Sequence, residues 1–175
     1  CAGLAARFRF DQAQIDLAQP QAAGALALAG QPIAAHCLVK GAMHRRKGTD
    51  GRDYAIGFEM RLPNAWNGRF FYQANGGIDG SVATALGGGG PVPTTALQQG
   101  FAVISSDAGH SGSTDTSFGI DFQARLDYGY QAADRLTPMA KALIAAAYGK
   151  RPDRSYFGGC SNGGRHTFVA MTRMP

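Results

Sequence analysis

Alternating apolar and polar residues mark the clearest predicted element of the chain. From Tyr54 to Leu62, apolar side chains occupy every second position after Ile56, and Gly, Glu and Arg lie between them. A period of two is typical of a strand with one buried face. A weaker apolar run covers 35–43, and the polar sequence at 48–51 separates the two runs. We therefore expect an antiparallel hairpin.

Three more short apolar runs predict strands, at 69–73, 101–104 and 155–158. The run at 101–104 is apolar throughout, which is typical of a strand buried on both faces in a parallel sheet, and we expect 155–158 to be another inner strand. Residues 76–95 are mostly small and include four consecutive glycines at 87–90. We expect a mobile surface loop there.

Helical periodicity appears in the second half of the chain. Apolar residues recur at spacings of three and four from Tyr130 to Ala147, and Gly149 is placed to end a helix. Pro138 either kinks this helix or begins a new one capped by Thr137. A further helix is predicted over 164–174. A hairpin followed by alternating strands and helices favours an α/β fold with antiparallel first strands and then a parallel sheet with flanking helices.

Composition and charge narrow the classes of partner. The 175 residues are 45% hydrophobic and only 17% charged, which excludes intrinsic disorder. The net charge of +5 is spread along the chain, and only Arg45, Arg46 and Lys47 cluster. We interpret this trio as a solvated hairpin tip and expect no nucleic-acid partner. No run approaches the roughly 18 apolar residues of a membrane span, so no membrane partner is expected. Any export signal is taken to have been removed before Cys1.

The candidate chemistry lies at 156–165, where Gly159, Ser161 and Gly163 form a G-x-S-x-G pattern between a predicted strand and a predicted helix. This context is typical of a nucleophile elbow, in which a sharp turn exposes the serine hydroxyl. A glycine-rich turn without chemistry is the alternative. The N–H of Asn162, at the start of the helix, could stabilise an oxyanion.

A second oxyanion donor is expected from a loop that follows an earlier strand. The loop at 73–80 follows such a strand, and its paired Gly76 and Gly77 let the backbone approach a substrate carbonyl closely. We expect Gly76 to border the substrate and the N–H of Gly77 to complete the hole with that of Asn162. A plain connecting loop is the alternative interpretation.

No histidine of the chain makes a convincing general base. His166 follows Ser161 on the same predicted helix, where its side chain should point away from the elbow. Asp107 and His110 could approach from the side as an unusual acid and base, although a local structural role is favoured. His36 and His44 flank the first hairpin and are interpreted as surface residues.

Several blocks of sequence resemble the tannase and feruloyl esterase family of serine α/β-hydrolases. They are residues 63–71, 75–77, 100–110, 148–149 and 159–165, and together they span nearly all of the chain. The resemblance implies an α/β-hydrolase core and hydrolysis of aromatic-acid esters such as gallate, ferulate or terephthalate monoesters. It also implies Ser161 as the nucleophile of a Ser-His-Asp triad, with Gly77 and Asn162 forming the oxyanion hole and no catalytic cofactor.

The same resemblance implies what lies outside the chain. In the family, a lid domain with the aromatic-acid pocket and usually a structural calcium follows the elbow helix, and the catalytic Asp and His come later. We therefore expect residues 1–175 to be the N-terminal part of the catalytic domain, with no metal ligands of their own. The remainder of the same polypeptide is then its partner, beside a small aromatic ester.

The resemblance also assigns the three cysteines. It implies a bridge between Cys1 and Cys37, worth about 3 to 4 kcal/mol by loop entropy, and a bridge from Cys160 to a cysteine beside the catalytic histidine, which is not in this chain. An oxidising location follows, either secreted or periplasmic. A lipidated Cys1 is the rival interpretation, although no lipobox is visible.

Three functional hypotheses remain open at this point. The first is the front part of an aromatic-ester hydrolase. The second is a short non-catalytic α/β protein, or fragment, that keeps an elbow-like turn. The third is a complete short hydrolase that uses His110 as its base.

Overall fold

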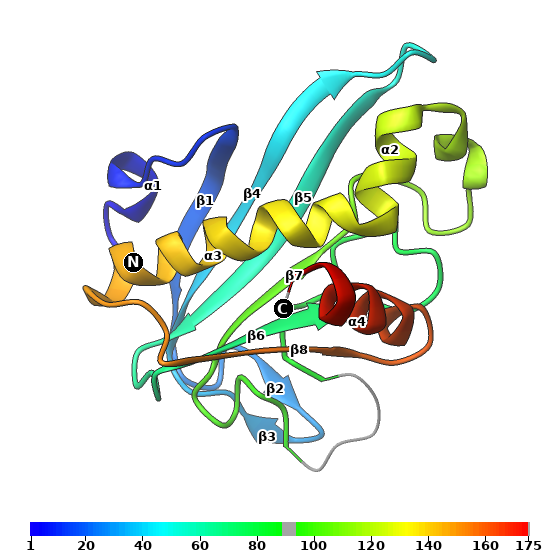
Figure 1. Cartoon of the computed structure of the whole chain (residues 1–175). Coiled ribbons are helices and arrows are strands. Elements are labelled where there is room, and N and C mark those ends of the chain that lie inside the picture. The colour runs from blue at the N-terminus through cyan, green and yellow to red at the C-terminus, as the bar shows by residue number, and fades with distance from the viewer. Residues whose placement is uncertain (89–93, 175) are drawn as a thin grey trace.

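A six-stranded mixed sheet forms the centre of the computed structural model, which describes residues 1–88 and 94–174, and helices α3 and α4 cover one face of the sheet (Figure 1). The strands are β1 (Ala13–Gln21), β2 (Ala27–Leu28), β3 (Gln31–Pro32), β4 (His36–Lys47), β5 (Asp53–Pro63), β6 (Arg69–Ala74), β7 (Ala102–Ser106) and β8 (Arg154–Gly159). The helical segments are α1 (Leu4–Arg7), η1 (Thr116–Ile120), α2 (Phe122–Leu126), η2 (Asp127–Gln131), α3 (Ala132–Tyr148) and α4 (Asn162–Arg173).

The sheet changes from antiparallel to parallel pairing along its width. Its order is β1-β4-β5-β7-β6-β8, and β2 and β3 form a separate two-stranded ribbon. Strands β1, β4, β5 and β7 pair antiparallel, whereas β6 pairs parallel with both β7 and β8. This confirms the predicted α/β architecture and the predicted hairpin of β4 and β5. No helix in the described ranges is long and apolar enough to cross a membrane.

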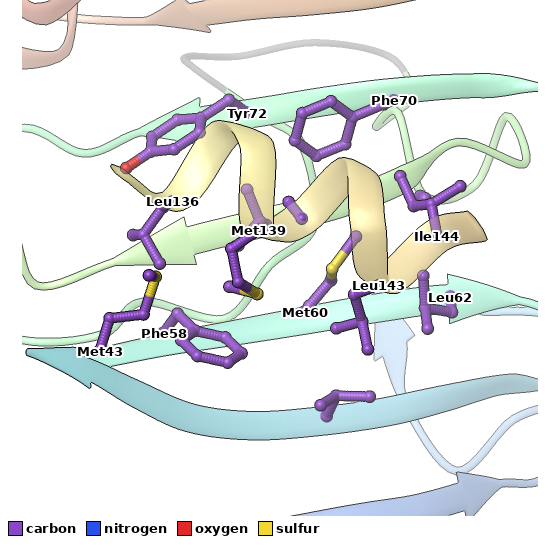
Figure 2. Close-up of a cluster of buried hydrophobic side chains, with 14 of the residues drawn as sticks. Met43, Phe58, Met60, Leu62, Phe70, Tyr72, Leu136, Met139, Leu143 and Ile144 are labelled. Carbon is purple, nitrogen blue, oxygen red and sulfur yellow. The ribbon is translucent and has the colours of Figure 1, made fainter. Parts of the chain in front are cut away.

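The main core lies between the sheet and α3. The alternating apolar side chains of β5 all point into it, together with Phe70 and Tyr72 of β6. Helix α3 supplies Leu136, Met139, Leu143 and Ile144, as Figure 2 shows. The predicted polar face of β5 is also covered, because Glu59 and Arg61 are buried. The strand is therefore buried on both faces, and the expectation of one exposed face is wrong.

A second core forms on the opposite face of the sheet. Its buried residues are Ile33, Ala85, Ala96, Leu97, Phe101 and Val103. The expectation of a surface loop over 76–95 is therefore wrong for Ala85, which is buried in this cluster, whereas residues 76, 77, 81, 82 and 84 are exposed as expected. The expected mobility of the loop stays a prediction. The part of that expectation that concerns 89–93 lies outside the described residues.

Helix α3 resolves the ambiguity at Pro138. The helix runs unbroken through Pro138, and Thr137 lies inside it, where its hydroxyl donates to the carbonyl of Ala133 at 2.7 Å. Thr137 therefore does not cap a second helix. Gly149 ends α3 with a φ of 78° and an N–H bond to the carbonyl of Ala145, as its position predicts.

The basic trio at 45–47 is only partly solvated, because Arg45 and Lys47 are exposed and Arg46 is half-buried. These residues belong to β4, and the turn comes after them. Arg46 forms two hydrogen bonds, of 2.5 and 3.1 Å, with the buried carboxylate of Asp121, which also caps α2. The hydrogen bonds from Arg46 hold the pKa of Asp121 well below its usual range. Arg46 thus links the β4–β5 hairpin to the segment that precedes α3.

Strand β8 lies at one edge of the described sheet, next to β6 only. Its first residues are exposed, including Tyr156 with 39% of its surface accessible. Since β6 is its one neighbouring strand among the described residues, the expectation of an inner strand stays a prediction. The apolar run at 155–158 does form a strand, but a run of this length does not distinguish an edge position from a central one.

His36 is buried, with 2% of its surface exposed, and not a surface residue as expected. Strand β1 pairs antiparallel with β4 at the edge of the sheet, and Gln21 is opposite His36 in that pairing. The Nδ1 atom of His36 lies 2.8 Å from the carbonyl of Ala34, and Nε2 lies 2.7 Å from a guanidinium nitrogen of Arg61. Because Arg61 can only donate, Nε2 must accept, and the ring is neutral. His44 is partly exposed.

Acid is expected to destabilise the protein through His36. Burial, and secondarily the charge of Arg61, lowers the pKa of His36, so the unfolded chain takes up a proton more readily than the folded one. Its contribution to stability is complete above the unfolded pKa of about 6.5 and is lost as pH falls below it, by at most about 1.4 kcal/mol per pH unit. Urea unfolding between pH 8 and pH 5 should show a smaller loss in His36→Gln. An equal loss in both proteins would assign the effect to His44 and His110, whose pKa values burial also lowers.

Candidate active site

Ser161 lies in a strained, exposed turn between β8 and α4. Its φ is 59° and its ψ is −122°, a conformation that residues with a Cβ rarely adopt. The turn is closed by two main-chain bonds of 2.9 Å, from Gly163 to the carbonyl of Cys160 and from Gly164 to that of Ser161. The Ser161 hydroxyl does not cap α4, so it is free to react. This is the geometry expected of a nucleophile elbow.

The glycines of the G-x-S-x-G pattern let the elbow pack against the end of β6. A Cβ atom built on Gly159 or on Gly163 would overlap the carbonyl oxygen of Ala74. On Gly159 it would also lie 2.8 Å from the Cα of Gly163. The two glycines are therefore required by close backbone approach, which holds the elbow beside the loop that follows β6.

The Asn75-Gly76-Gly77 loop lies directly against the elbow, as the sequence predicts. A Cβ on Gly76 would be 3.9 Å from the Cβ of Ser161, and Gly77 has a φ of 64°. Asn75 anchors the loop by donating to the hydroxyl of Ser105 and to the carbonyl of Ser106, at 3.0 and 2.8 Å. Asn162 is the first residue of α4, where N–H groups have no carbonyl partner within the helix. The structure thus brings Gly76 next to Ser161, and Gly77 and Asn162 are the residues that follow these two in the chain.

A buried polar network behind the elbow was not predicted. The side chains of Asp79, Asn162 and His166 are joined by hydrogen bonds, which extend to Arg165 and Tyr128. Asp79 lies in the predicted oxyanion loop, but its partners are 83 and 87 residues away. His166 faces Asp79, with Nε2 2.8 Å from a carboxylate oxygen. The sequence signal for this network is Asp79, an acidic residue two positions after the paired glycines.

Comparison with known proteins identifies the family. A sequence model of the family described as tannase and feruloyl esterase matches residues 37–175. The chain belongs to this family.

Curated members of the tannase and feruloyl esterase family share much of this sequence. The chain is 43% identical over 150 residues to a mono(2-hydroxyethyl) terephthalate hydrolase of Piscinibacter sakaiensis, covering 80% of this chain and 25% of that protein. It is 35% identical over 120 residues to a probable feruloyl esterase B-2 of Aspergillus flavus, and the match covers 67% of this chain and 21% of that protein. The chain therefore spans about a quarter or less of the length of these relatives.

Solved structures confirm the α/β-hydrolase fold. Feruloyl esterase B from Aspergillus oryzae superposes with a TM-score of 0.83 at 25% identity, covering 100% of this chain and 34% of that one. A second esterase from Aspergillus oryzae superposes with a TM-score of 0.78 at 21% identity, covering 97% of this chain and 34% of that one. This likeness supports the fold alone.

His110 and Asp107 occupy structural positions in this tannase-family chain. The His110 ring is 2% exposed and stacks on Phe118 with 3.7 Å between ring centroids. Asp107 accepts main-chain bonds from Gly57 and Gly109, and burial raises its pKa to about 7. Within the described part of the chain, neither side chain is hydrogen-bonded to Ser161. This arrangement does not support a short hydrolase that uses His110 as its base.

The cysteines divide into a bridged pair and a free thiol. Cys1 and Cys37 form a disulfide with Cα atoms 5.3 Å apart, and Cys160, next to Ser161, is exposed and free. The disulfide fastens the N-terminal segment to β4. Among the residues that the structure describes, no group of three or more His, Cys, Asp or Glu side chains is placed to hold a metal ion.

Proposed function

We propose that this chain is the N-terminal part of the catalytic domain of a serine esterase that hydrolyses esters of aromatic carboxylic acids. The conformation of Ser161 carries the proposal, because its turn is strained and exposed as in a nucleophile elbow and lies next to Gly76 of the candidate oxyanion loop. The printed names of the relatives, a terephthalate monoester hydrolase and feruloyl esterases, support the substrate class.

The reaction begins with attack of the Ser161 hydroxyl oxygen on the ester carbonyl. A base takes the hydroxyl proton, and the N–H groups of Gly77 and Asn162 donate hydrogen bonds to the carbonyl oxygen as negative charge develops on it. The ester C–O bond then breaks, the alcohol leaves with the proton, and an aromatic acyl group remains on Ser161. Water, activated by the same base, attacks the acyl-enzyme and releases the aromatic acid.

The base and its orienting acid are proposed to be a His and an Asp outside residues 1–175. Two facts support this placement. The His110 ring stacks on Phe118 and His166 is bonded to Asp79, and the chain matches only 25% of the length of the terephthalate monoester hydrolase. The lid domain, its calcium and the cysteine partner of Cys160 are proposed to lie outside these residues too. The disulfide between Cys1 and Cys37 favours a secreted or periplasmic location.

An ester panel tests the proposed function. The full-length protein that carries these residues is offered methyl gallate, methyl ferulate and a terephthalate monoester, with an aliphatic ester such as methyl butyrate as the comparison. We expect hydrolysis of at least one aromatic ester with kcat/KM at least tenfold above that for the aliphatic ester. A protein that hydrolyses none of the four would instead support the non-catalytic interpretation.

A further inference from the structure

We propose that the side chains of Asp79 and Asn162 form a clamp that fixes the spacing between the two halves of the oxyanion hole. One half, Gly77, lies in a loop, and the other, the N–H of Asn162, lies at the start of a helix. The inference rests on the proposed function, since the spacing matters only if Ser161 attacks an ester. Asp79 and Asn162 act in it as positioning residues through their side chains.

A single carboxylate oxygen joins the loop to the helix. Oδ2 of Asp79 accepts a bond of 2.7 Å from the side-chain amide of Asn162 and one of 2.8 Å from Nε2 of His166. Asn162 and His166 are four residues apart on α4, so their side chains lie on the same face of its first turn. The carboxylate of Asp79 is hydrogen-bonded to both of them. Asp79 is only 6% exposed, so water competes little for these bonds.

Asp79 is in turn connected to Gly77 by the geometry of the loop. Its N–H donates to the carbonyl of Gly76 at 3.3 Å, which closes a tight turn around Gly77. The next residue, Gly80, bonds to the carbonyl of Asp107 at 3.1 Å. Gly77 has no side chain and a left-handed φ, so its position depends on these neighbours. A shift of Asp79 would therefore move the Gly77 N–H.

The other end of the Asn162 amide is held from α4 and η2. Its Oδ1 accepts from Nε of Arg165 at 2.7 Å and from the hydroxyl of Tyr128 at 3.3 Å. Arg165 also donates to the main-chain carbonyls of Tyr128 and Gly129, at 3.1 and 3.2 Å. Both carbonyls belong to η2, a turn of π-helix. The donor and acceptor groups of the Asn162 side chain are thus both used, which leaves it one orientation.

His166 completes the network. Its Nε2 lies 2.8 Å from Oδ2 of Asp79, and one guanidinium nitrogen of Arg165 lies 3.2 Å from Nε2 and 3.4 Å from Nδ1. The His166 ring therefore supports the clamp from the side of α4.

The clamp is expected to affect the rate of the chemical step. A displacement of about 1 Å in a catalytic group can cost about 100-fold in rate. In the full-length protein, Asp79→Ala should lower kcat for the preferred aromatic ester by about 10- to 100-fold, with KM changed by less than about threefold. Asn162→Ala keeps the main-chain N–H and should give a similar loss.

Two comparisons separate positioning from general stability. The double variant of Asp79→Ala and Asn162→Ala should be no slower than the slower single variant, because both remove the same link. Asp79→Asn, which keeps an oxygen that can accept the two bonds, should recover most of kcat. Glu59→Ala serves as the matched control, since Glu59 is a buried carboxylate, with a 5% exposed side chain, that binds Arg61 and the main chain of Ala85. It should lower the melting temperature and leave kcat unchanged.

Hydrogen exchange provides a readout that does not need activity. Main-chain amides at 76–80 should exchange at least about tenfold faster in Asp79→Ala than in the wild type, and not in Glu59→Ala. Unchanged exchange, or an active Asp79→Ala with wild-type kcat, would overturn the clamp. An inactive wild type with faster exchange in Asp79→Ala would overturn the proposed function and still support the clamp.

Discussion

Replacing Ser161 by alanine is expected to abolish ester hydrolysis, with a fall in kcat on the order of 10⁶-fold. The Ser161 oxygen is the atom that we propose to form the acyl bond, and an oxyanion hole without a nucleophile retains only a small part of the rate enhancement. The expected cost in stability is small, within about 0.5 kcal/mol, because the side chain is exposed and makes no capping bond to α4.

The measurement combines turnover with covalent labelling. A fluorophosphonate should label the wild type at Ser161 and leave Ser161→Ala unlabelled, while both proteins melt at similar temperatures. Ser155→Ala, an exposed serine of β8, is the matched control and should keep wild-type kcat. A Ser161→Ala protein with more than about 1% of wild-type kcat, well above the residual rate expected without the nucleophile, would place the nucleophile elsewhere.

The elbow could be predicted from sequence because each of its requirements is local. Gly159, Ser161 and Gly163 lie within five positions, and the strand and helix on either side are visible as short-range patterns. The hairpin of β4 and β5 was predictable for the same reason, since its turn and its apolar alternation lie in one stretch of about 30 residues. Local patterns of this kind determine which backbone conformation the chain adopts, independently of distant contacts.

The contacts that could not be predicted join residues far apart in the chain. His36 is a polar residue beside the first hairpin, where a surface position is expected, but it is buried and its Nε2 lies 2.7 Å from Arg61. Asp79 was visible as part of a loop, yet nothing near it in sequence indicates Asn162 or His166 as partners. Contacts between residues so far apart depend on the order of the strands in the sheet. The periodicity of apolar residues predicts strands and helices but does not predict that order.

Replacing Gly163 by alanine should damage both stability and catalysis. A Cβ at this buried position would overlap the carbonyl oxygen of Ala74 and lie 3.0 Å from its carbonyl carbon and 3.2 Å from the carbonyl oxygen of Asn75. All three are main-chain atoms that cannot rotate away, so β6 and α4 must move apart. Overpacking of this kind costs about 3 kcal/mol. The same movement separates Gly76 and Gly77 from Ser161, and kcat should fall by about 100-fold or more.

The adjacent glycine supplies the control that decides whether this packing is the cause. A Cβ on Gly164 would meet only the carbonyl oxygen of Gly159, at 3.8 Å, an ordinary contact. Gly164→Ala should therefore leave kcat near the wild-type value and raise the free energy of unfolding by about 0.5 to 1 kcal/mol, because alanine favours a helix interior over glycine. Urea unfolding and kcat of the two variants test the difference. If Gly163→Ala were as stable as Gly164→Ala, the approach of β6 to the elbow would not be what requires glycine at 163.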